Sequence, residues 1–160
     1  MMESMSPVVR TIIKIAFAPM FAFGAYIILH GHLTPGGGFQ GGAIIGSLFA
    51  LYMIAYGATR WKKKLLSGIE SGGLLVFIGT GLLGLISGYM FFNFLSDSDI
   101  PIFNEAIPSM AGVDHPNWAP LWSGGTVSVM NLAVGFEVVA ALTLIIVTMG
   151  LFAFEGKEDA

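Results

Sequence analysis

The sequence of 160 residues contains no cysteine and few charged side chains. Without cysteine, the chain forms no disulfide, no thiolate metal site and no iron–sulfur cluster. Only 11% of the residues are charged, less than half the share of about 25% that is usual in soluble domains, which argues against a soluble globular enzyme. The net charge of −3 leaves no basic surface that would attract nucleic acid.

Apolar residues, by contrast, make up 55% of the chain and gather in long runs. A helix needs about 20 mostly apolar residues to cross a bilayer, and its backbone must be satisfied internally there. The sequence therefore predicts an all-α polytopic membrane protein, a single domain over residues 1–160. Four transmembrane helices are expected at about 11–29, 39–57, 72–95 and 126–154, with an outer loop at 96–125.

The seven basic residues are distributed unevenly between the expected loops. With four spans, both termini and the basic run Arg60-Trp61-Lys62-Lys63-Lys64 lie on one side, and all seven fall there. Because basic residues near span ends are retained in the cytoplasm, we predict that both termini are inside.

Glycine is abundant, with 22 residues, and several recur at a spacing that places them on one helix face. Small residues four apart let helices approach closely in lipid. Such positions serve packing within the bundle or docking against other subunits, and the sequence leaves both open. The candidates in the two middle spans are Gly38, Gly42, Gly46, Gly84 and Gly88.

The candidate chemistry is sparse, and Glu137 is the most informative residue. It lies about 16 Å along the fourth span at 1.5 Å per residue, where an isolated charge is costly. It is either a station on a proton or cation path or a protonated, hydrogen-bonded packing group. His30, His32 and Asn131 are further path candidates, although the histidines equally suit a helix end and Asn131 a hydrogen bond between helices. No catalytic set or metal-ligand cluster is present in the sequence, so neither enzyme activity nor a cofactor is expected.

The stretch His30-Gly-His-Leu-Thr-Pro-Gly-Gly-Gly-Phe-Gln-Gly-Gly-Ala43 resembles the signature of the MnhB/MrpB family. These proteins are small subunits of Mrp-type multisubunit Na⁺/H⁺ antiporters, and related subunits occur in membrane-bound hydrogenase and respiratory complexes. Within this stretch, helix packing or partner contacts are expected at Pro35, Gly37, Gly38, Phe39, Gln40 and Gly42.

The resemblance implies a non-catalytic subunit in the plasma membrane of a prokaryote, surrounded by lipid and other membrane subunits. Na⁺ and H⁺ would be the transported ions, and the host would be a dedicated antiporter or a hydrogenase-like complex. The alternative is a purely structural subunit without ion contact.

Overall fold

The computed structural model describes residues 5–33, 35–56, 62–95 and 124–158, with side chains up to residue 150. Its helices are α1 (Pro7–His30), α2 (Gly38–Tyr56), α3 (Lys63–Leu83), the short 3₁₀ helix η1 (Gly84–Ser87) and α5 (Thr126–Glu158). Within these ranges the chain is entirely helical apart from turns and short connections.

Four helices are long and apolar enough to cross a membrane, as the sequence predicts. Their spans are Pro7–His30, Gly38–Tyr56, Lys63–Ser87 and Thr126–Gly150. The side chains that face outward are largely apolar, including Ile15 at 72% exposure and Leu75 at 69%. An apolar exterior of this kind suits lipid or neighbouring membrane helices rather than water.

The third helix differs most from its predicted position at 72–95. It begins at Lys63, within a run of exposed lysines whose aliphatic stems can lie along a helix while the ammonium stays in water. It ends at Leu83, and Gly88 and Phe91 beyond it have φ angles of 136° and 63°. A left-handed residue cannot continue a right-handed helix, so the chain turns, and the Phe91 N–H donates to the Gly81 carbonyl.

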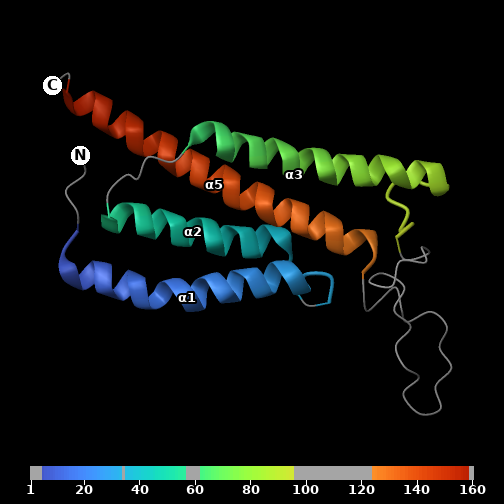
Figure 1. The fold of residues 1–160 in the computed structure, drawn as a ribbon, viewed down its shortest axis with the longest axis horizontal. Helices are drawn as coiled ribbons and strands as arrows, with labels where there is room; N and C mark the ends of the chain where they lie inside the picture. Colours follow the sequence, from blue (N-terminus) through green and yellow to red (C-terminus); the bar gives the residue numbers. More distant parts are fainter. Residues whose placement is uncertain (1–4, 34, 57–61, 96–123, 159–160) are drawn as a thin grey trace, which may run out of the picture.

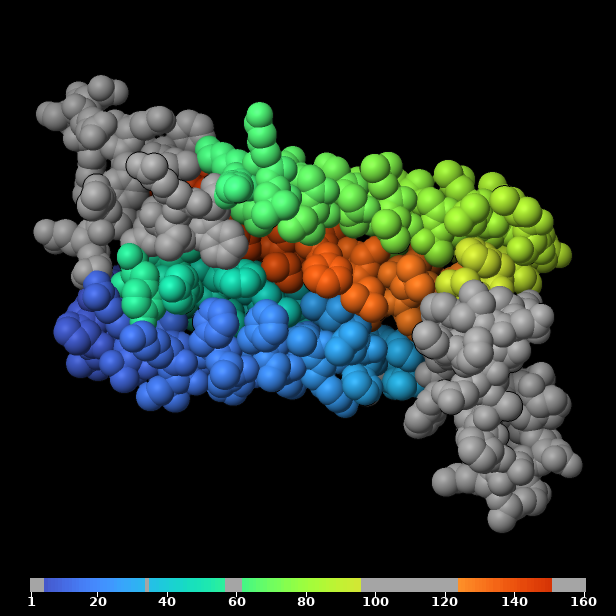
Figure 2. All heavy atoms as spheres, in the orientation of Figure 1, coloured from blue at the N-terminus to red at the C-terminus, as the bar shows by residue number. Residues whose placement is uncertain are grey.

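Helix α5 is the centre of the arrangement. It crosses obliquely between α2 and α3, and α1 lies against the other side of α2 (Figure 1). In the space-filling view, α5 is recessed between the ridges formed by α1 and α3 (Figure 2). The helices therefore follow the spatial order α1, α2, α5 and α3, and α2 has to pack closely on two sides.

Glycines on two faces of α2 allow this double packing. On one face, a Cβ at Gly41 would lie 2.6 Å from the carbonyl oxygen of Gly24 in α1. On the other face, a Cβ at Gly42 would lie 3.0 Å from the carbonyl oxygen of Gly135 in α5, and one at Gly46 would lie 3.0 Å from Leu142. Gly38, Gly42 and Gly46 thus face α5 of the same chain.

The other proposed packing pair, Gly84 and Gly88, does not form an α-helical face. Gly84 begins η1, and a Cβ there would meet the backbone of the following turn at Tyr89 and Phe92. Gly88 is exposed, and a Cβ there would meet nothing within 4 Å. The spacing of four residues does not place the two together, because the chain leaves the α-helical geometry between them.

Candidate functional site

The polar centre of the molecule is the side chain of Asn131 in α5. Its Oδ1 accepts a hydrogen bond from the Gly38 N–H at 2.5 Å, and its Nδ2 donates to the carbonyl of Ile28. Ile28 belongs to the last turn of α1, and Gly38 is the first residue of α2. A helix end leaves such backbone groups without an intrahelical partner. The single side-chain amide of Asn131 therefore supplies hydrogen-bond partners to the end of α1 and to the start of α2.

The glycine-rich turn between α1 and α2 leaves room for this amide. A Cβ at Gly31 would lie 2.5 Å from Asn131 Nδ2 and 2.6 Å from the Cα of Gly37. A Cβ at Gly38 would overlap the main chain of α5 at Asn131 and Gly135. Gly36 has a φ of 129°, which an L side chain rarely adopts. The motif therefore builds a tight turn around a side chain from a distant part of the sequence.

The remaining predicted residues of this motif lie at the surface or outside the amide contact. Pro35, Phe39 and Gln40 are exposed, with Phe39 at 64%. The His30 ring stacks on the Tyr26 ring, with centroids 4.3 Å apart. The structure thus leaves the predicted packing or partner contacts of these exposed side chains as a prediction.

The start of α5 lies at the same end of the bundle. Asn93 Oδ1 accepts hydrogen bonds from the Thr126 N–H at 2.7 Å and from the Thr126 hydroxyl at 2.8 Å. A Cβ at Gly124 would lie 2.8 Å from the His32 ring. The structure therefore gathers His30, His32 and Asn131 at one end, where α1, α2 and α5 meet.

Glu137 lies apart from this polar centre, six positions further along α5. It is half-buried where α5 packs on α3, and a Cβ at Gly73 would lie 2.9 Å from the Glu137 Cβ. Among the described residues, its carboxylate forms no ion pair. Of the four predicted path residues, Glu137 is thus the one that the structure does not bring together with the others.

A second acid, Glu70, shares this interface and was missed by the sequence analysis. It is half-buried and stands between the buried residues Leu66 and Gly73, so helix geometry places it on the same face of α3. Leu66 packs in a cluster with Val147 of α5, whereas Gly73 lies directly opposite Glu137. Glu70 therefore lies between these two levels, within about one helix turn of Glu137.

The signal for Glu70 was present in the sequence. Leu66, Gly73 and Thr80 recur at intervals of seven, and Glu70 falls within that stripe. The predicted span begins at about residue 72, so Glu70 falls just outside it. Among the described residues, the structure shows no group of three or more side chains that could hold a metal ion.

The fold and the placement of its polar groups define a multi-pass helical membrane protein whose polar side chains join helices. The family model for the domain related to the MnhB subunit of Na⁺/H⁺ antiporters matches residues 8–144. This chain belongs to the MnhB family.

Curated relatives agree with this assignment. An uncharacterized protein of Methanocaldococcus jannaschii is 36% identical over 128 residues, covering 78% of this chain and 44% of that longer protein. A Staphylococcus haemolyticus protein named "Putative antiporter subunit mnhB2" is 32% identical over 108 residues, covering 60% of this chain and 77% of the relative. The same name belongs to a Staphylococcus saprophyticus protein that is 31% identical over 112 residues, covering 65% of this chain and 77% of that protein.

Proposed function

We propose that this protein is a non-catalytic subunit of an Mrp-type multisubunit Na⁺/H⁺ antiporter in the plasma membrane of a prokaryote. The match to the MnhB family over residues 8–144 carries the proposal. The names of the staphylococcal relatives favour an antiporter over a hydrogenase-like complex as the host. Its partners are then the other membrane subunits, and Na⁺ and H⁺ are the transported ions. The confinement of the basic residues to one side supports an orientation with both termini inside.

Within that complex, the interface between α3 and α5 is proposed to border the ion path. Glu137 and Glu70 are both half-buried there, in a bundle whose exterior is apolar. Acidic side chains within membrane spans are costly and generally mark ion pathways. The two carboxylates therefore offer oxygen ligands to a transported cation at this interface.

The test is exchange activity in vesicles that contain the assembled complex. Glu137→Gln and Glu70→Gln replace the carboxylate by an amide but keep the shape and hydrogen-bonding ability of each side chain. Each should slow Na⁺-dependent proton exchange about a hundredfold or more, the loss typical of removing a positioned proton-transfer group. Glu155→Gln is the matched control, because residue 155 lies beyond the fourth predicted span, which ends at about 154.

Assembly has to be measured in the same membranes, by native gel electrophoresis. Normal exchange by a fully assembled Glu137→Gln complex would remove this carboxylate from the ion path. If Glu70→Gln also exchanged normally, the proposed ion contact would be refuted.

A purely structural role is the second candidate, and a specific feature of α3 supports it. Gly68, Gly72 and Gly79 lie along one stripe of this helix, and a Cβ at each would meet nothing within 4 Å. Small residues with open space beside them suit the close approach of another helix. Gly72→Leu should then prevent assembly of the complex, whereas Glu137→Gln should have no effect on exchange. Gly42 and Gly46 are unsuitable for this test, because they already face α5.

A further inference from the structure

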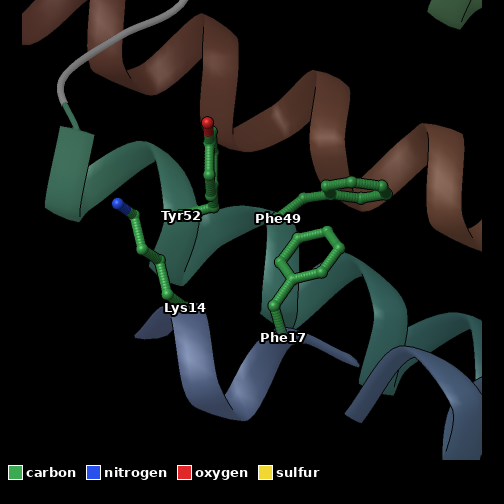
Figure 3. Close-up of a pocket in the computed structure, with 4 residues that line it drawn as sticks. All are labelled: Lys14, Phe17, Phe49 and Tyr52. Atoms are coloured by element: carbon green, nitrogen blue, oxygen red, sulfur yellow. The ribbon is translucent and has the colours of Figure 1, made fainter. Parts of the chain in front are cut away.

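A surface groove between α1 and α2 is lined by one lysine and three aromatic side chains. Its volume is about 450 Å³, and its lining residues are Lys14, Phe17, Phe49 and Tyr52 (Figure 3). The Phe17 ring packs edge-on against Phe49 at 6.4 Å and against Tyr52 at 6.0 Å between centroids. These ring contacts join the two walls of the groove. Its lining is aromatic except for Lys14, which supplies the one positive charge.

Lys14 is exposed, and its ammonium forms no ion pair or hydrogen bond with any residue in the described ranges. It lies seven positions after Pro7, or about 10 Å along α1. A lysine near the end of a span extends its stem so that the ammonium reaches the headgroup region. Its Nζ points toward the end at which α2 stops (Figure 3), which is also the end at which α1 begins (Figure 1).

The neighbouring cation on this face of α1 is already engaged. Arg10 lies one turn earlier, where its Nε donates to the Ala55 carbonyl at 3.4 Å and its guanidinium sits 5.5 Å from the centre of the Tyr56 ring. The Tyr56 hydroxyl in turn donates to the Arg10 carbonyl at 3.2 Å. Arg10 therefore ties α1 to α2 beside the groove and adds positive charge there, and Lys14 is the cation turned toward an external ligand.

We infer that this groove binds an anionic phospholipid from the leaflet in which α1 begins. The Lys14 ammonium contacts the headgroup phosphate, and an acyl chain lies along Phe17 and Phe49. A lipid fits better than a soluble anion, because the walls are apolar and the cation stands at headgroup depth. An anionic lipid fits better than a zwitterionic one, because the local charge is positive and not neutralised by the described residues.

The experiment compares retention of phosphatidylglycerol and phosphatidylcholine with identical acyl chains, by native mass spectrometry of the full-length chain. The wild-type chain should retain phosphatidylglycerol preferentially. Lys14→Gln should reduce that preference about fivefold, the effect of one basic residue near an anionic headgroup. Lys14→Arg should keep it. Lys64→Gln is the matched control, since it removes the same charge from the exposed start of α3 and should change nothing.

Unchanged retention in Lys14→Gln, or a loss in Lys14→Arg equal to that in Lys14→Gln, would overturn the inference. If Lys14→Gln does not fold, the wild-type comparison decides, and equal retention of the two lipids refutes a headgroup contact. A carbodiimide cross-link between Lys14 and another subunit of the assembled complex would also refute it, because a protein carboxylate would then occupy the place of the lipid.

Discussion

Replacing Asn131 by leucine tests the polar centre of the bundle directly. Leucine keeps the number and branching of the side-chain heavy atoms of asparagine but has no polar atom, so the substitution removes both hydrogen bonds. The Gly38 N–H and the Ile28 carbonyl lose the amide that now joins them. Hydrogen bonds between membrane helices average about 0.6 kcal/mol and reach about 1.7 kcal/mol. Two such bonds predict that Asn131→Leu lowers the free energy of unfolding by about 1–3 kcal/mol.

The assay is unfolding of the purified chain in mixed micelles of rising sodium dodecyl sulfate content, followed by circular dichroism. Thr148→Val is the matched control, because the Thr148 hydroxyl donates to the Leu144 carbonyl within its own helix. Its loss should cost less than about 0.5 kcal/mol. Equal stability of Asn131→Leu and the wild type would refute the role assigned to the amide, as would an equal loss in the control.

Asn131→Asp refines this test, because aspartate keeps the acceptor for Gly38 but loses the donor to Ile28. The ionised form sets a carboxylate oxygen against a carbonyl oxygen and should destabilise the bundle at least as much as leucine does. Protonation supplies an O–H donor, so this variant should become more stable as the pH falls. A stability that does not change with pH would contradict the proposed geometry.

Three further predictions follow from the same contacts. Gly42→Ala should destabilise the isolated chain by about 1–3 kcal/mol, because its Cβ would lie 2.8 Å from a valine of α5. In the same dodecyl sulfate titration, Gly72→Ala should stabilise the chain by about 0.5–1 kcal/mol through its higher helix propensity. Asn93→Ala should cost about 1–2 kcal/mol and speed hydrogen exchange at the start of α5, and unchanged exchange would argue against its capping role. Single cysteines placed at Leu33 and Lys64 should react with an impermeant maleimide from opposite sides of the membrane, and labelling from one side would contradict the predicted topology.

The number of spans could be predicted from the sequence, because length and hydropathy alone decide whether a helix crosses lipid. The limits of α3 could not, because apolar runs alone do not show how far exposed lysines extend a helix. Lys63 opens α3 although it lies in the basic run that was assigned to a loop. The shift of that boundary is also why Glu70 was overlooked.

The glycine-rich turn shows a different limit of sequence analysis. Its residues predict a tight turn, and Asn131 predicts a hydrogen bond between helices. In the structure, the turn and the Asn131 side chain form one contact. This depends on how α5 crosses α2, and no local sequence pattern specifies that crossing. Gly38 and Asn131 are 93 positions apart in the sequence, and only the three-dimensional packing joins them.

The unequal lengths of α2 and α5 make the bundle sensitive to bilayer thickness. The 19 residues of α2 span about 28 Å and match an apolar layer of about 30 Å while standing nearly upright. The span Thr126–Gly150 of α5 already has 25 residues, covers about 37 Å and has to tilt to fit. Asn131 joins α5 to the start of α2 at one end of the bundle. A change in the tilt of α5 therefore changes the distance between the two helices at the opposite end. Longer acyl chains should therefore straighten α5 and narrow the angle at which it crosses α2.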